Sequence, residues 1–271
     1  MSVTVTWLGW STFRVAIDGG PTLVFDPCVS PLLNDRHARF DQIADADLFV
    51  LTHGHHEHLK DVPRLARRLP HVPLVAPAQV REYLVGICGI DRARIGLAVP
   101  DEALEWEGVT LLPRAFPHLP KHDVPGKVAN LRRDNPLGAP WLLLRFGPRI
   151  VRSWFAIRKQ PEFGPFLAYD LRAGDRRLVF TCEAFTELIA AEEIARWRGD
   201  EPVDLAVIGV ESGQEDAAAS LTSVLGAARS LCCPVHATFE RFYGKPPVDG
   251  ERWRQGRADR AVWTVGDTIS L

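Results

Sequence analysis

Four histidines and one glutamate are crowded into a stretch of six residues in this chain of 271 residues. His53 and His55 stand two positions apart, so in an extended segment both side chains point to the same side. Glu57 and His58 follow at the point where the residue pattern changes to that of a helix. Imidazole and carboxylate groups bind zinc, iron and manganese. The stretch therefore predicts a metal site rather than an exposed loop that is merely rich in histidine.

The segments around this stretch are those needed to hold it at the edge of a sheet. An apolar run at 47–51 leads into it, and a helical pattern at 59–69 follows and stops before Pro70. Strand and helix patterns alternate in two similar halves, which indicates an α/β fold with helices outside two mixed sheets. Further strands are expected at 3–7, 12–17, 22–25, 72–76, 109–116, 167–171, 178–181, 204–210, 234–238 and 261–265, and further helices at 78–87, before Gly199, at 217–231 and at 250–259.

The composition is that of a globular protein and excludes several classes of protein. Lys and Arg number 32 and Asp and Glu 34, a net charge of −2, which argues against a surface that binds nucleic acid or anionic membrane as a whole. No apolar run approaches the ~20 residues of a membrane span. No signal peptide precedes the first strand, so a cytoplasmic location is expected. The five cysteines are odd in number and include no Cys-x-x-Cys, so no disulfide framework is expected.

The stretch His53-x-His55-x-Glu57-His58 resembles the His-x-His-x-Asp-His signature of the metallo-β-lactamase superfamily, with Glu in the position of the Asp. The resemblance extends over nearly the whole chain. It implies an α/β fold, a four-layer αββα sandwich of two mixed β-sheets flanked by helices. It also implies one domain over residues 1–271.

The opening of the chain resembles one branch of that superfamily. The segments that start at Thr6 and Leu23 are similar to the opening of the ascorbate-phosphate lactonases and the N-acyl-phosphatidylethanolamine phospholipase D-like hydrolases. That branch usually has Gly-His-Ser or Gly-His-Ala, and Trp10 stands here in the position of the His. Trp10 is expected either to line the pocket or to pack in the core. Asp26 is expected either to form a turn or to hold a ligand histidine by a hydrogen bond.

The later metal ligands of the superfamily are assigned here by resemblance. The third-motif histidine corresponds to His118, with His122 as the alternative. Glu183 follows a predicted strand where the superfamily has its bridging Asp, and His236 occupies the place of the last histidine. The resemblance then implies two divalent metal ions, the first bound by His53, His55 and His118, the second by Glu57, His58 and His236, and both bridged by Glu183.

Glu57 and Glu183 both stand where the superfamily has Asp. The added methylene lengthens the reach of each carboxylate by more than ~1 Å, whereas metal–ligand distances vary by only about 0.2 Å. Two changes of the same kind indicate a retuned site. Zinc is the expected metal. Iron and manganese are the alternatives, because carboxylate ligands suit these two metals.

The resemblance implies a binuclear metal-dependent hydrolase. A metal-bound hydroxide would attack a carbonyl carbon or a phosphorus atom, and Glu57 would bind metal and also orient the water or accept its proton. An oxygen-activating di-iron redox enzyme on the same fold is the main alternative, motivated by the two glutamates. A metal-binding protein without enzymatic activity and a nucleic-acid-processing enzyme are further, less favoured alternatives.

The region at about 118–160 differs from the rest of the chain in its charge. It holds nine Lys and Arg against two Asp, a local charge of +7 in a chain whose total is −2. We interpret it as a basic, aromatic-containing insertion over one rim of the domain, with a solvated charged loop as the alternative. Because arginine side chains suit anionic oxygens, the expected partner is an anionic small molecule such as an ester, a lactone or a phosphate ester.

Overall fold

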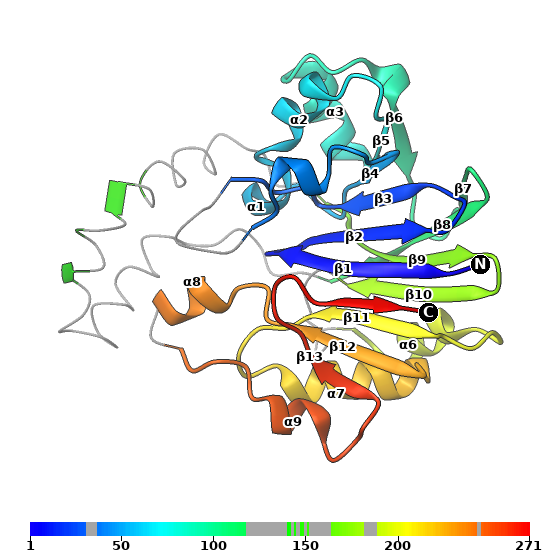
Figure 1. The fold of residues 1–271 in the computed structure, drawn as a ribbon, viewed down its shortest axis with the longest axis vertical. Helices are drawn as coiled ribbons and strands as arrows, with labels where there is room; N and C mark the ends of the chain where they lie inside the picture. Colours follow the sequence, from blue (N-terminus) through cyan, green and yellow to red (C-terminus); the bar gives the residue numbers. More distant parts are fainter. Residues whose placement is uncertain are drawn as a thin grey trace.

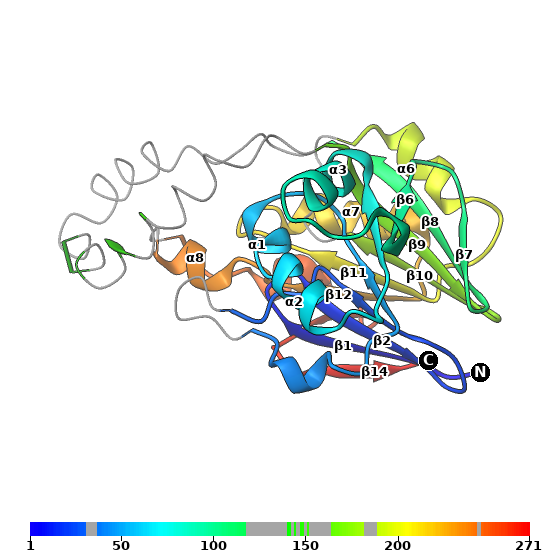
Figure 2. The same ribbon diagram turned by 90° about the horizontal axis from the view of Figure 1, so that it is seen from above.

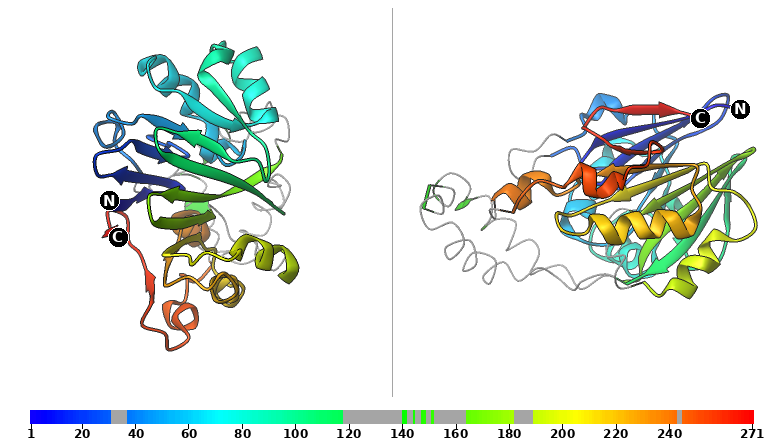
Figure 3. Two further views of the ribbon diagram at one scale, coloured as in Figure 1. Left: turned by 90° about the vertical axis from the view of Figure 1, so that its right-hand side faces the viewer. Right: turned by 90° about the horizontal axis from the view of Figure 1, so that it is seen from below.

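The computed structural model describes residues 1–30, 37–117, 140–141, 144, 147–148, 151, 164–181, 189–242 and 245–271. The described residues form two seven-stranded mixed β-sheets, with helices over the outer faces (Figures 1 and 3). The α/β class and the arrangement of two sheets between helices, expected from the sequence, are confirmed. The two ends of the chain lie close together (Figure 2), because the last strand pairs with the first.

The first sheet has an antiparallel part and a parallel part. In spatial order its strands are β14 Thr268–Ser270, β1 Val3–Gly9, β2 Thr12–Ile17, β3 Thr22–Phe25, β4 Leu48–Val50, β5 Leu74–Pro77 and β6 Ile95–Ala98. The pairs from β14 to β3 are antiparallel, and those from β3 to β6 are parallel. Parallel strands are buried on both faces, and every residue of β4 and β5 is buried accordingly.

The second sheet repeats this plan. In spatial order its strands are β13 Arg260–Val262, β12 Arg229–Cys233, β11 Leu205–Gly209, β10 Arg176–Thr181, β9 Phe166–Ala173, β8 Val109–Phe116 and β7 Leu104–Trp106. The pairs from β7 to β10 are antiparallel, and those from β10 to β13 are parallel. Each sheet therefore has one antiparallel part and one parallel edge, and the last strand of the chain, β14, completes the first sheet.

The helices connect and cover these strands. They are α1 His56–Leu59, α2 Val62–Arg68, α3 Ala78–Gly86, α6 Ala191–Arg198, α7 Glu215–Leu225, α8 Ala237–Phe242 and α9 Gly250–Arg254, with 3-10 turns at Phe40–Gln42 and Arg92–Arg94. In the part of the chain that the structure describes, no helix is long and apolar enough to cross a membrane.

Three hydrophobic cores correspond to the three interfaces of the sandwich. The central core lies between the sheets, where Phe25 of β3 stacks on Phe180 of β10 with ring centroids 4.7 Å apart. The second core packs Phe49 of β4 beneath α2 and α3. The third packs Ile208 of β11 beneath helices that include α7, and it contains the fully buried Trp253. The four layers are thus held by burial of apolar side chains on both faces of each sheet.

In the second half, the elements around Gly226 and Pro234 differ from the prediction. The helix expected at 217–231 ends at Leu225, because Gly226 adopts a left-handed conformation with φ +66° and ends the helix. The following residues form β12, so the strand expected at 234–238 is wrong. Pro234 cannot donate a hydrogen bond to a sheet, and β12 ends one residue before it.

The helix expected at 59–69 is two helices. α1 begins earlier, at His56, and ends at Leu59. α2 then starts at Val62 with a proline in its first turn, where the missing N–H has no intrahelical partner to lose. The earlier start places Glu57 and His58 inside a helix rather than before one.

A buried ion pair fastens the second sheet to α6. The Arg177 guanidinium donates to Asp170 through Nε (3.0 Å) and Nη2 (2.7 Å), and both side chains are almost fully buried. The same guanidinium donates to the carbonyl oxygens of Trp197, Arg198 and Glu201, where α6 ends. Every charge-bearing atom of this pair is therefore satisfied inside the protein.

We predict that Arg177→Met lowers the free energy of unfolding by about 3–5 kcal/mol, because it leaves the Asp170 carboxylate buried and unpaired. Urea unfolding followed by circular dichroism measures the change. The double variant Asp170→Leu with Arg177→Met removes both charges, so it is expected to be more stable than Arg177→Met alone. A double variant less stable than Arg177→Met would show that the unpaired Asp170 carboxylate does not cause the loss of stability.

Candidate metal centre

The predicted histidine cluster lies where parallel strands of the first sheet end. β3 ends at Phe25 and β4 at Val50, and these two residues pair in register. Asp26 N–H donates to the carbonyl oxygen of Val50 (2.9 Å), so the chains that leave the two strands run side by side. Ligand sites of α/β sheets form at the carboxyl ends of the strands. Figure 1 shows α1, which carries part of the cluster, directly beyond this edge.

The second sheet fixes the same loop from the other side. The backbone N–H of Leu167 in β9 donates to the carbonyl oxygen of Thr52 (3.1 Å). The hydroxyl of the buried Tyr169, also in β9, donates to the carbonyl oxygen of Leu51 (2.8 Å). The backbone just before His53 is therefore clamped between the two sheets.

The structure brings three of the predicted ligand histidines together. The ring centroid of His53 lies 4.0 Å from that of His58 and 4.6 Å from that of His55. His53 and His58 are buried, and Glu57, in the same helical turn as His58, is only 8% exposed. The ring of Phe166 lies against His53 and His55, with centroids 5.0 and 5.4 Å away. The cluster thus has an apolar wall on one side.

The fully buried carboxylate of Asp26 connects this cluster to the sheet. Its Oδ1 accepts the backbone N–H of Thr52 (2.9 Å), and its Oδ2 accepts the Thr52 hydroxyl (2.6 Å). Oδ2 also lies 2.8 Å from Nδ1 of His58. Asp26 has φ +42°, a left-handed conformation that is uncommon for a residue with a side chain. Of the two roles expected for Asp26, the structure shows the hydrogen bond to a predicted ligand histidine.

These contacts determine which ring nitrogen carries the proton. A carboxylate only accepts hydrogen bonds, so His58 donates Nδ1–H to Asp26. The single hydroxyl proton of Thr52 is donated to Asp26, and Nδ1 of His53 lies 2.9 Å from that hydroxyl oxygen. His53 must therefore donate Nδ1–H to Thr52. In both neutral rings the lone pair then resides on Nε2, the nitrogen suited to bind a metal.

His236 is held in the same way by the second sheet. It lies just beyond the carboxyl end of β12, and its Nδ1 is 2.7 Å from Oε1 of Glu211, which follows β11. Lys245 lies 3.5 Å from the other oxygen of that carboxylate. Glu211 was not expected from the sequence. The one signal for it is an acidic residue shortly after a fully buried strand.

The described residues bring together only part of the predicted site. His118, its alternative His122 and Glu183 lie outside the described residues, as does most of the insertion at 118–160. Within the described residues, no group of three or more His, Cys, Asp or Glu side chains is arranged to hold a metal ion. The seven-ligand set therefore stays a prediction.

Three of the cysteine thiols in the described part of the chain are buried. Burial raises the pKa of Cys28 to about 12 and that of Cys233 well above its usual value. Burial likewise raises the pKa of Cys232. In the protein without bound metal, burial therefore favours the neutral form of these three thiols. Cys232 and Cys233 are completely buried in the core.

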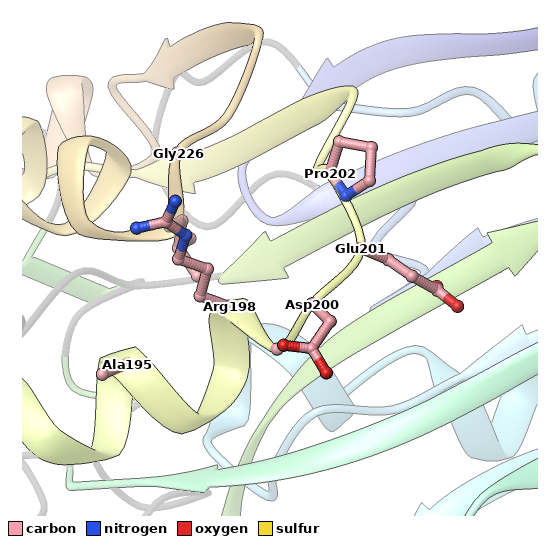
Figure 4. A pocket seen from close by; sticks show the side chains of 8 residues that line it. Ala195, Arg198, Asp200, Glu201, Pro202 and Gly226 are labelled. Carbon is pink, nitrogen blue, oxygen red and sulfur yellow. The ribbon is translucent and has the colours of Figure 1, made fainter.

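A cavity of about 630 Å³ lies in the second sheet at the amino ends of β11 and β12, the ends opposite to those that lead to Glu211 and His236. Figure 4 shows it between the end of α6, with Arg198, Asp200 and Glu201, and Gly226 after α7. These residues precede β11 and β12, so the cavity is at the amino ends of the strands that lead to Glu211 and His236. It is therefore separate from the histidine cluster.

Comparison with known proteins gives partial matches in sequence. No family model matches the chain. A UPF0173 metal-dependent hydrolase of Polaromonas sp. is 38% identical over 88 residues, which are 32% of this chain and 32% of that protein. A UPF0173 metal-dependent hydrolase of Methanopyrus kandleri is 34% identical over 103 residues, 37% of this chain and 43% of that protein. The chain thus matches less than half the length of these relatives.

Solved structures match the chain over its whole length. Igni18 of Ignicoccus hospitalis, described as a metallo hydrolase, has a TM-score of 0.67 at 16% identity and covers 100% of this chain and 99% of its own. The metallo-β-lactamase fold protein YhfI of Bacillus subtilis has a TM-score of 0.59 at 13% identity and covers both chains fully. CmlA, a diiron β-hydroxylase of Streptomyces venezuelae, has a TM-score of 0.60 at 14% identity, covering 99% of this chain and 54% of its own.

The chain therefore has the metallo-β-lactamase fold. The resemblance to that superfamily, first drawn from the histidine stretch, is confirmed by the fold and by the metal-dependent hydrolases that match part of the sequence. The narrower resemblance to the lactonase and phospholipase D-like branch stays a prediction.

We predict that Asp26→Asn lowers the free energy of unfolding by about 1–3 kcal/mol, because an amide in this place leaves a buried donor without an acceptor. Asn tolerates a left-handed backbone, so the substitution removes the carboxylate without adding backbone strain at this residue. Urea unfolding measures the loss. Asp18→Asn, at an exposed turn, is the control and should leave stability unchanged. Equal stability of the two variants would contradict the role given to the Asp26 carboxylate.

Proposed function

We propose that this protein is a binuclear metal-dependent hydrolase. The observation that carries the proposal is the pair His53 and His58, whose adjacent rings both donate Nδ1–H into the Asp26–Thr52 network. Metal-binding histidines usually donate the second ring N–H to a carboxylate or another oxygen. The relatives that match about a third of the chain, described as metal-dependent hydrolases, support the same activity.

The chemistry of the donor groups fits divalent metal ions. His53, His58 and His236 are almost fully buried, and each is oriented through Nδ1. Neutral imidazoles and carboxylates suit zinc, and also iron and manganese. In the proposal the two ions are bound by His53, His55, Glu57, His58 and His236, together with His118 and Glu183 from outside the described residues.

Divalent ions held by these residues lower the pKa of a water molecule and polarise an oxygen of the substrate. Glu57 accepts one proton from the attacking water and passes it to the leaving oxygen. The water oxygen forms the new bond to carbon or phosphorus as the bond to the leaving oxygen breaks. Asp26 and Glu211 act through the histidines, since they hold the rings and do not touch the substrate.

An anionic small molecule is the substrate class that we propose. The region 118–160 carries a charge of +7 in a chain of charge −2, and arginine side chains bind the oxygens of phosphate and carboxylate groups. Phosphate esters present such oxygens, as do esters and lactones that also carry a carboxylate or phosphate group. The expected cytoplasmic location stays a prediction.

Replacing Arg132 and Arg133 with Gln is expected to raise KM for an anionic phosphate ester such as bis(p-nitrophenyl) phosphate by about fivefold, with little change in kcat. Steady-state kinetics at low and high salt measure the effect, which should shrink as salt screens the charges. The control replaces Arg229 and Arg257, which are exposed in other parts of the chain. An equal rise of KM in the control would refute a specific role for the insertion.

A di-iron redox enzyme is the second candidate. It is favoured by Glu57, a longer carboxylate in the position where the superfamily signature has Asp. CmlA, which shares the fold, is described as a diiron β-hydroxylase. Protein that binds about two iron ions per chain and hydrolyses none of the esters would favour this candidate.

We predict about two zinc or manganese ions per chain in protein purified without a histidine tag. His55→Ala should lose most of this metal and about a hundredfold of the hydrolytic rate, because it removes a proposed ligand. Mass spectrometry of metals and hydrolysis of phosphate esters and lactones provide the two measurements. His71→Ala, at an exposed position, should change neither.

Two outcomes would contradict the proposal. Metal content equal in wild type and His55→Ala would mean that the histidine cluster is not the metal site. Protein that takes up less than about a tenth of an ion per chain, even after reconstitution, would mean that the residues do not form a metal site at all.

A further inference from the structure

The connection between β1 and β2 has an unusual backbone. The register of the two strands shifts between Trp7 and Gly9, as in a β-bulge, and bulges next to active sites redirect side chains. Gly9 has φ +105° and Trp10 has φ +50°. A bulky residue in the left-handed region costs about 1–3 kcal/mol and persists only where its surroundings impose it. Here the Trp7 indole donates to the carbonyl oxygen of Trp10 (2.6 Å) and holds this conformation.

This backbone places the Trp10 side chain beside the candidate metal centre. Its ring centroid lies 5.2 Å from that of His236, with an angle of 52° between the planes, and the residue is 6% exposed. His236 follows β12 of the second sheet, whereas Trp10 leaves β1 of the first. The strained connection in the first sheet therefore places the Trp10 ring against His236, a proposed metal ligand that follows a strand of the second sheet.

The indole N–H of Trp10 is buried and has no hydrogen-bond acceptor among the described residues. An unsatisfied buried donor costs about 1–3 kcal/mol, and an indole nitrogen can only donate. Trp106 on β7 has a similar buried N–H, so lack of an acceptor alone does not mark a site. What distinguishes Trp10 is the combination of this donor with a strained backbone and contact with His236.

We propose that Trp10 is a specificity-determining residue whose indole N–H donates a hydrogen bond to an anionic oxygen of the substrate. This inference rests on the proposed function, because it requires the substrate to bind beside His236. A buried N–H donor forms a stronger hydrogen bond to a charged phosphate or carboxylate oxygen than to an uncharged oxygen. Trp10 therefore selects substrates that present such an oxygen at the metal centre.

The test uses zinc-loaded protein labelled with 15N at its eight tryptophans and inorganic phosphate as the probe. The Trp10 indole signal is assigned by its absence from Trp10→Phe. Phosphate should move this signal downfield and slow its hydrogen exchange, because the N–H enters a hydrogen bond to a charged oxygen. The Trp106 indole signal should stay in place.

The variants provide a second measurement. Trp10→Phe keeps an aromatic ring but removes the donor, so calorimetry should show phosphate binding about tenfold weaker at unchanged zinc content. Trp106→Phe makes the same change far from His236 and should bind phosphate as the wild type does. Loss of zinc from Trp10→Phe would assign Trp10 a purely structural role and overturn the inference.

The outcomes also separate this inference from the proposed function. Wild-type protein that binds zinc and hydrolyses esters, but whose Trp10 signal does not respond to phosphate, overturns the role of Trp10 alone. Wild-type protein that binds no metal overturns both.

Discussion

The buried carboxylate of Asp26 is the constraint on which the rest of the site depends. A buried charge is tolerated only when it is well hydrogen-bonded, and Asp26 obtains its donors from the backbone and hydroxyl of Thr52 and from His58. These bonds fix the end of β4, the orientation of α1 and the proton positions in two histidine rings. The left-handed backbone of Asp26 is thereby offset by contacts that only the folded chain offers.

The proposed site draws on both sheets, although the histidine stretch that first indicates it belongs to one. The first sheet supplies the His53 stretch, and β9 of the second sheet clamps the loop before it. His236, a proposed ligand, follows a strand of the second sheet and is oriented by Glu211, and Trp10 of the first sheet contacts it. The sandwich is thus what positions the groups, and its apolar cores supply the rigidity that metal–ligand distances require.

The sequence predicted features that depend on local pattern and missed those that depend on distant pairing. The strands at Thr12–Ile17 and Thr22–Phe25 were predicted at their observed bounds from alternation and turn residues. The prediction for the second half of the chain was less accurate, because Gly226 ends a helix inside an apolar run. Glu211 lies 25 residues from His236, and no local pattern joins them. For Asp26 the sequence left two roles open, a turn or a hydrogen bond to a ligand histidine. Its partner, His58, lies 32 residues away along the chain, so the pairing is visible only in the fold.

The Asp26–Thr52 network holds Nδ1–H of His53 and His58, and Glu211 holds Nδ1–H of His236, so we expect all three histidines to bind metal through Nε2. Long-range 1H–15N NMR spectra of the histidine side chains, recorded during a zinc titration, test it most directly. We expect His53, His58 and His236 to keep Nδ1–H throughout, while their Nε2 signals shift as zinc binds. Spectra in which zinc leaves these Nε2 signals unchanged, or in which Nδ1 of His58 loses its proton, would contradict the claim.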